Sequence, residues 1–216
     1  MNDNSLLNCV ECGVRNCYHK ETDYPDVCPT TAEETQEIIS ASKKIYLNSP
    51  EDKKIMLCAA ENEGLHHDDY TRVEEIVYFA KTMGFKKIGI ATCTGLVRES
   101  RVFCEILRKK GLSPYSVVCK VGSVEKSELG VKEEHKLRRD CYESSCNPVL
   151  QAKLLNEAGT ELNVVVGLCV GHDSLFIKHS DAIVTTLITK DRIMGHNPAA
   201  ALYTSGSYYK RLLKED

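Results

Sequence analysis

Cysteine is the residue type whose number and spacing indicate chemistry in this sequence. Eleven of the 216 residues are Cys, and an odd number cannot pair completely within one chain. The first residues, up to Cys12, have neither the basic start nor the apolar stretch of a secretory signal. We therefore expect a cytoplasmic protein. In such a reducing compartment, clustered Cys residues are more typical of metal or redox sites than of disulfides.

The first group of cysteines lies near the N-terminus with the spacing C-x2-C-x4-C-x10-C. Residues 1–29 show almost no hydrophobic periodicity, so they offer no core in which four thiols could pack. Two thiolates separated by two residues can bind one metal centre, because the turn between them points both sulfurs the same way. We predict that this Cys-rich segment, residues 1–29, binds a metal through Cys9, Cys12, Cys17 and Cys28.

The spacing alone leaves the identity of the metal open. A zinc ribbon offers two close Cys pairs, and only the first pair is close here. A fourth Cys followed by proline, as in Cys28-Pro29, is typical of iron–sulfur segments, although the ferredoxin spacing differs. An iron–sulfur cluster of the 4Fe-4S type is the favoured cofactor, and zinc is the alternative.

From residue 30 onwards the sequence alternates helical and strand patterns. Thr30 and Glu33 have the spacing of a capping box, and Ser49-Pro50 has the pattern of a second helix start. Short apolar runs predict four strands, and helical spacing predicts the helices between them. The expected strands cover about 88–92, 116–121, 163–168 and 182–188, and the expected helices cover about 73–83, 98–110, 148–158 and a short stretch after Gly171.

Alternating strands and helices predict an α/β domain. We expect residues 30–190 to form three layers around a mostly parallel four-stranded sheet, with the flavodoxin-like strand order 2-1-3-4. Residues 191–216 are turn-rich at first and follow the last strand, so we expect this C-terminal segment to pack on or cap a site at the carboxyl edge of the sheet.

A second group of cysteines is dispersed along the chain but follows the predicted strands. Cys93, Cys119 and Cys169 each lie at the carboxyl end of a strand, where open α/β sheets bind their ligands. Cys146 precedes Asn147-Pro148, the predicted start of a helix, whose positive end lowers the pKa of a thiol. Any one of these residues could be a buried packing cysteine, but together they predict a second metal centre.

His172 follows two glycines after the third strand and is expected to face the same edge. It is our candidate catalytic residue, since an imidazole can transfer a proton near neutral pH; a metal ligand and a loop histidine are the alternatives. Cys58 and Cys104 fall inside predicted helices and are interpreted as structural. The phosphate-binding patterns G-x-x-x-x-G-K-[ST] and G-x-G-x-x-G are absent.

Four segments together resemble a known family. They are Cys9-Val-Glu-Cys-Gly13, Cys146-Asn-Pro148, Gly167-Leu-Cys-Val-Gly-His-Asp173 and Gly195-His-Asn-Pro198. They are similar to the cysteine-rich, metal-binding proteins known as domain of unknown function 1847. The resemblance implies a prokaryotic metal-associated protein, with Cys9, Cys12, Cys146 and Cys169 as ligands, and it implies no particular reaction.

Composition narrows the classes of partner. A net charge of −3 and the absence of Trp argue against a nucleic-acid surface, and no apolar stretch approaches the roughly 20 residues that a membrane helix needs. We expect an electron-transfer partner or a small-molecule substrate for an iron–sulfur protein. The alternatives are a zinc-stabilised binding module without redox activity and metal-free thiol chemistry at Cys93.

Overall fold

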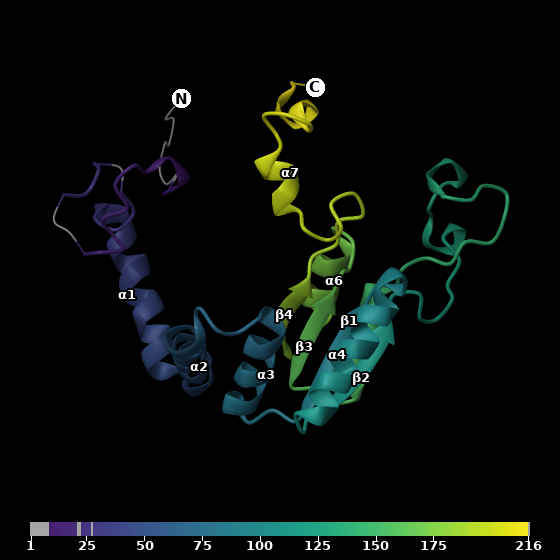
Figure 1. The fold of residues 1–216 in the computed structure, drawn as a ribbon, viewed down its shortest axis with the longest axis horizontal. Helices are drawn as coiled ribbons and strands as arrows, with labels where there is room; N and C mark the ends of the chain where they lie inside the picture. The colour runs from purple at the N-terminus through teal and green to yellow at the C-terminus, as the bar shows by residue number, and fades with distance from the viewer. Residues whose placement is uncertain (1–8, 21–22, 27, 216) are drawn as a thin grey trace. The chain divides into compact units, whose positions relative to one another are not determined.

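The computed structural model describes residues 9–20, 23–26 and 28–215 (Figure 1). The chain divides into two compact units, Met1–Glu63 and Gly64–Asp216. The boundaries predicted between residues 29 and 30 and between 190 and 191 stay predictions.

The first unit contains two helices, α1 (Glu33–Asn48) and most of α2 (Pro50–His66). The predicted capping box of Thr30 and Glu33 is wrong: Ala32 is the N-cap of α1 and makes no side-chain hydrogen bond. The reason is the turn at Cys28, whose carbonyl accepts the amides of Thr31 and Ala32 and so delays the helix. The second predicted start is confirmed, since the Ser49 hydroxyl accepts the amide of Asp52 at 3.2 Å.

The second unit is built on a parallel four-stranded sheet in the order β2-β1-β3-β4, as predicted. The strands are β1 (Lys87–Thr92), β2 (Ser113–Val118), β3 (Leu162–Val166) and β4 (Ile183–Ile188). β2 begins at Ser113, earlier than the apolar pattern predicts. The pattern missed these first residues because they include Pro114, and they form a strand nonetheless because β2 lies at the edge of the sheet. An edge strand tolerates proline and polar side chains that a central strand does not.

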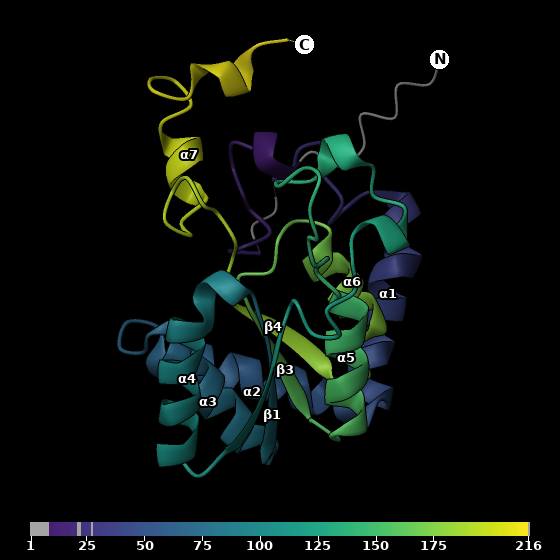
Figure 2. The same ribbon diagram turned by 90° about the vertical axis from the view of Figure 1, so that its right-hand side faces the viewer.

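Helices cover both faces of this sheet, which confirms the three-layer α/β architecture. Figure 2 shows α3 (Arg72–Met83) and α4 (Val97–Lys109) on one side, and α5 (Pro148–Glu157) and α6 (His172–His179) on the other. One apolar core joins α3 and α4 to the sheet, with Ile88, Ile90 and Val164 fully buried. A second core joins α5 and α6 to the opposite face and includes two of the predicted ligands, Cys93 and Cys119.

Local sequence signals explain the ends of α3. Thr71 and Glu74 form the capping box, in which the Glu74 carboxylate accepts the Thr71 amide at 2.8 Å. Gly84 ends the helix in the left-handed conformation, with φ of 82°.

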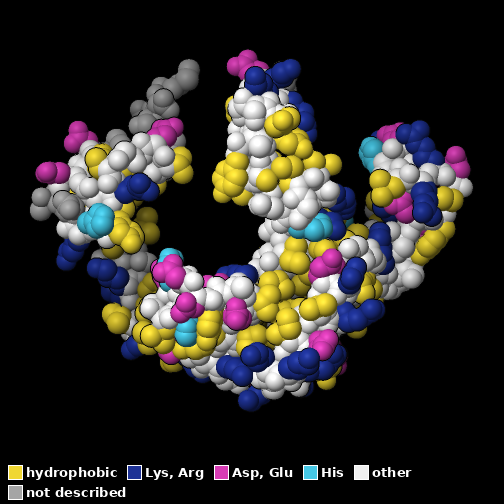
Figure 3. All heavy atoms as spheres, in the orientation of Figure 1, with side chains coloured by type: hydrophobic (Ala, Val, Ile, Leu, Met, Phe, Trp, Pro, Cys, Tyr) yellow, Lys and Arg dark blue, Asp and Glu magenta, His cyan; other side chains and the backbone are white. Residues whose placement is uncertain are grey.

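Two segments leave the sheet at its carboxyl edge. Residues 122–147 form a polar loop held by Lys126–Glu143 and by Lys136, which is nearly buried between Glu125 and Glu133. The C-terminal segment carries α7 (Ala199–Tyr203) and a short 3-10 helix, and Figure 3 shows apolar side chains on its surface. No helix among the residues placed in the structure is long and apolar enough to span a membrane.

Candidate functional site

The carboxyl edge of the sheet brings together the four dispersed cysteines, which we call the rim thiols (Cys93, Cys119, Cys146 and Cys169). Backbone hydrogen bonds fix two of them against the strand ends: the Cys93 amide donates to Val166, and the Cys119 amide donates to Thr92. The Asn147 amide donates to the Cys119 carbonyl at 2.7 Å. The end of the polar loop is thereby held beside the end of β2.

Three of the rim thiols are linked by sulfur contacts or hydrogen bonds, and Cys169 is linked to them by charge. The sulfurs of Cys119 and Cys146 lie 3.8 Å apart. The hydrogen bond with Cys119 is also the main reason why the pKa of Cys93 rises to about 12, with burial adding to it. The same neighbour, aided by Lys120 and opposed by burial, lowers the pKa of Cys146 to about 6. The charges of Cys146 and Cys169 also interact, so all four thiols share one electrostatic environment.

Three cationic side chains surround these sulfurs. Lys190 donates to the Cys93 sulfur at 3.4 Å, and Arg192 donates to the Cys169 sulfur at 3.0 Å. Lys120 is the third cation, and its charge acts on Cys146. Positive charge beside a thiol favours the thiolate, which is the form that binds metals and attacks electrophiles.

His172 is the first residue of α6 and is half-buried at the same edge. Its amide donates to the Cys169 carbonyl at 2.9 Å, which ties the helix to the turn that carries this thiol. Burial, with the charge of Lys120, lowers the pKa of His172. The imidazole is therefore mainly neutral at neutral pH, with one ring nitrogen that can accept a proton and one that donates a hydrogen bond.

Two buried residues position the rim: Gln151, which the sequence did not indicate, and Gly167, which belongs to the predicted motif around Cys169. Gln151 of α5 is fully buried, and its amide nitrogen donates to the carbonyls of Thr92 and Val117, at the ends of β1 and β2. Gly167 has φ of 66°, and a Cβ there would lie 2.0 Å from the Leu96 side chain and 3.6 Å from that of Lys190. A fully buried glutamine gives no periodic signal, whereas the glycine belongs to the motif around Cys169.

The N-terminal segment forms a separate arrangement within the first unit. Cys9 and Cys12 are joined by a turn in which the Cys12 amide donates to the Cys9 carbonyl. The Cys12 sulfur accepts the Arg15 amide at 3.4 Å, and this bond, with a second from Val14, lowers the pKa of Cys12. Amides directed at a sulfur are a common feature around metal-bound thiolates.

All four N-terminal thiols line one cavity of about 630 Å³, together with Tyr18 and the prolines Pro25 and Pro29. No group of three or more His, Cys, Asp or Glu side chains, within the ranges that the structure describes, is already arranged to hold a single ion.

The remaining cysteines have other surroundings. Cys58 and Cys104 are buried in helices, and burial raises the pKa of each thiol. Cys141 is exposed in the polar loop. His66 stacks on Tyr70 with ring centres 3.8 Å apart, which accounts for it without a metal.

Comparison with known proteins gives a family and a relative. The family model described as a protein of unknown function, DUF1847, matches residues 28–187, a range that contains all four rim thiols. The chain is also 42% identical to the uncharacterised protein MJ0455 of Methanocaldococcus jannaschii over 208 residues, covering 96% of this chain and 99% of that protein. No solved structure matches. The chain belongs to the DUF1847 family.

Proposed function

We propose that this protein is an iron–sulfur protein with two centres, one in the N-terminal segment and one at the rim thiols. The observation that carries the proposal is the meeting of four thiols from four separate segments at the carboxyl edge of the sheet. Thiolate sulfur is a soft ligand suited to iron–sulfur clusters. Packing alone does not account for the cations directed at these sulfurs.

Charge supports a thiolate-bound centre at the rim. Four thiolates around a 4Fe-4S core, or around one zinc ion, carry a net charge of about −2. Lys120, Lys190 and Arg192 offset this charge from positions that already contact or act on the sulfurs. Hydrogen bonds and positive charge around the sulfurs are also what tunes the potential of a cluster.

The N-terminal cavity supports a cluster in the first unit. Its volume of about 630 Å³ is much larger than one ion needs, and its walls carry Cys9, Cys12, Cys17 and Cys28. The segment has no buried residues in its first turn and lacks a core of its own. Binding of a metal centre would supply the folding free energy that hydrophobic burial does not.

In a reducing cytoplasm, the rim centre would either transfer electrons or bind and convert a small molecule. Arg192 is exposed beside Cys169, so the edge is open to a partner on that side. His172, with its lowered pKa, would exchange a proton with a molecule bound at the centre. An electron-transfer partner or a small soluble substrate fits this arrangement.

One distance favours a second candidate, a zinc-stabilised binding module. Two thiolates on one tetrahedral zinc, with bonds of about 2.3 Å, lie about 3.8 Å apart. The Cys119 and Cys146 sulfurs have a separation of 3.8 Å. In this alternative zinc stabilises the fold, and the protein has no redox activity.

Metal stoichiometry of matched variants tests the proposal. We expect Cys146→Ala and Cys12→Ala each to lose about one centre's worth of iron and acid-labile sulfide, because each removes a ligand from a different centre. Cys141→Ala is the control, since Cys141 is exposed and belongs to neither group. Equal iron in all three variants and the wild type would overturn the assignment of ligands.

A further inference from the structure

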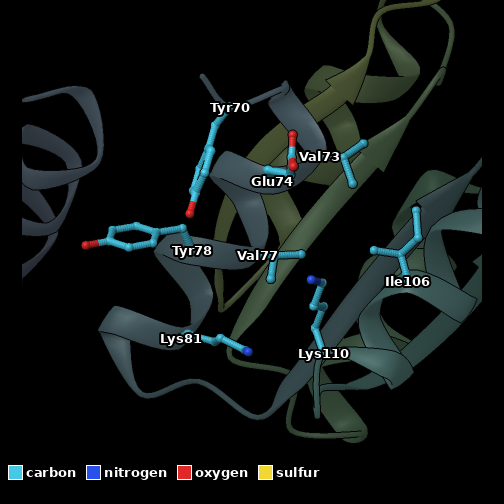
Figure 4. Close-up of a pocket in the computed structure, with 8 residues that line it drawn as sticks. All are labelled: Tyr70, Val73, Glu74, Val77, Tyr78, Lys81, Ile106 and Lys110. Atoms are coloured by element: carbon cyan, nitrogen blue, oxygen red, sulfur yellow. The ribbon is translucent and has the colours of Figure 1, made fainter. Parts of the chain in front are cut away.

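A groove between α3 and α4, remote from the rim thiols, has the features of a small-molecule site. It has a volume of about 240 Å³, and its lining includes Val73, Val77 and Lys81 of α3, with Ile106 and Lys110 from α4 and its C-cap (Figure 4). Both helices run from the carboxyl edge of the sheet to its amino edge. The two lysines therefore lie at the end of the domain opposite to the cysteines.

The two walls of the groove repeat the same pattern. Val73, Val77 and Lys81 are spaced by four residues and share one face of α3. On the other wall, Ile106 is followed four residues later by Lys110. Each wall is thus apolar toward the N-terminus of its helix and positively charged toward the C-terminus. The apolar residues pack against the core below, and Val77 is only 7% exposed.

The two ammonium groups point into the same space. Figure 4 shows the ends of Lys81 and Lys110 directed into the space between the helices, with the Lys110 ammonium beside Val77 and that of Lys81 below it. In the described part of the chain, neither ammonium has a carboxylate within ion-pair distance, whereas the adjacent Lys109 pairs with Glu105 at 2.9 Å. A helix dipole favours lysines at this end, but it does not explain why two helices direct them at one point.

Glu74 is the acidic side chain that lines the groove, and its carboxylate already accepts hydrogen bonds from Thr71. The Glu74 carboxylate accepts the amide and hydroxyl of Thr71 at 2.8 and 2.6 Å, and these bonds are the main reason for its lowered pKa. Glu74 lies nearly two helical turns from Lys81, about 10 Å along the axis. The charge of Lys110 is a smaller further cause of the lowered pKa of Glu74. Among the residues that the structure describes, Glu74 forms no ion pair with Lys81 or Lys110, so both ammonium groups can still bind an anion.

We propose that this groove binds a small carboxylate with an aromatic or branched apolar body. The carboxylate would lie between Lys81 and Lys110, and the apolar body would cover Val73, Val77 and Ile106. Tyr70, which stacks on His66, closes the other end. A volume of about 240 Å³ equals that of about eight waters. It suits a ring with a short acid chain and is below the roughly 300 Å³ at which pockets for larger ligands begin.

Titration of the purified full-length protein with 3-phenylpropanoate and with 3-phenylpropanamide tests the proposal, because the two probes differ in charge and hardly in shape. We expect the carboxylate to bind at least about tenfold more tightly than the amide, and more weakly as salt is raised. Lys81→Gln and Lys110→Gln should each weaken binding about fivefold. Lys109→Gln, a neighbouring exposed lysine, should leave the affinity within about twofold of wild type.

Three results would overturn the proposal: equal affinities for the two probes, wild-type affinity in Lys81→Gln and Lys110→Gln, or no binding of 3-phenylpropanoate at about 5 mM. Both lysines are exposed, so the variants are expected to fold, and a thermal melt of each checks this. The outcome is independent of the metal proposal, because the groove shares no residue with either group of cysteines.

Discussion

The sulfur of Cys146 lies 3.8 Å from the sulfur of Cys119, although 27 residues separate them along the chain. The polar loop between them leaves the sheet after β2 and returns to the same point, where the Asn147 amide binds the Cys119 carbonyl. The loop therefore delivers a thiol from the start of α5 to the end of a strand. This contact is the basis of two predictions.

The first prediction concerns oxidation of the metal-free protein. A mild oxidant such as diamide, which takes up two electrons and two protons, should join Cys119 and Cys146 in a disulfide, because their sulfurs are already adjacent. The mass of the intact chain falls by about 2 Da, and peptide mapping locates the bond. Cys58→Ser should behave as wild type. A bond formed elsewhere would contradict the rim geometry.

The second prediction is the pH dependence of alkylation at Cys146. Because its pKa is lowered to about 6, the reactive thiolate is present above pH 6 and is lost as the pH falls below it. In metal-free protein, the rate of reaction with iodoacetamide at this residue should therefore be half-maximal near pH 6. Cys119→Ala should move the midpoint upward, since it removes the largest stabilising contact. A wild-type midpoint near the ordinary thiol value of about 8.5 would refute the prediction.

Lys190 is expected to set the reduction potential of the rim centre. Its ammonium lies 3.4 Å from the Cys93 sulfur, and a positive charge stabilises the reduced, more negative state. In the iron-loaded protein, Lys190→Gln should lower the midpoint potential by roughly 65–130 mV, the one-electron equivalent of about 1.5–3 kcal/mol for one hydrogen bond to a charged group. Lys109→Gln, at the opposite edge, serves as the control. An unchanged potential in Lys190→Gln would show that Lys190 does not act on the proposed rim centre.

Gly167 tests the packing that supports the rim. Gly167→Ala places a methyl group 2.0 Å from the Leu96 side chain at a φ of 66°, and so combines a clash with backbone strain. We expect the free energy of unfolding to fall by about 2 kcal/mol or more, measured by chemical denaturation. Gly64→Ala is the matched control, because a Cβ at this helical position meets nothing within 4 Å. Equal stability of the two variants would contradict the prediction and show that the Leu96 side chain can move away from the added methyl group without cost.

Periodicity predicted the layers and the strand order, because the strands are short apolar runs separated by clear helix starts such as Asn147-Pro148. It failed where local hydrogen bonds compete: Thr30 looked like a cap, but the turn at Cys28 shifted the helix start to Ala32. The capping box that does form, at Thr71 and Glu74, has the same spacing. Spacing alone therefore cannot choose between two such pairs.

The rim thiols were predictable as a group, since strand ends in a parallel sheet must meet at one edge. The turn that carries Lys190 and Arg192 was expected at the same edge, but the contacts of these cations with particular sulfurs were not predicted. Lys190 and Arg192 lie in a turn whose path over the edge depends on tertiary packing, and Lys120 has no local signal. Sequence spacing also could not predict that the sulfurs of Cys119 and Cys146 lie 3.8 Å apart, the distance that makes zinc the alternative metal at the rim.

Metal and sulfide analysis of anaerobically purified protein, with a visible spectrum of the same sample, tests the central claim most directly. The proposal predicts a brown protein with about eight iron and eight sulfide per chain, because two 4Fe-4S centres are assigned. A colourless protein with stoichiometric zinc and no labile sulfide would contradict it and favour the zinc-stabilised module.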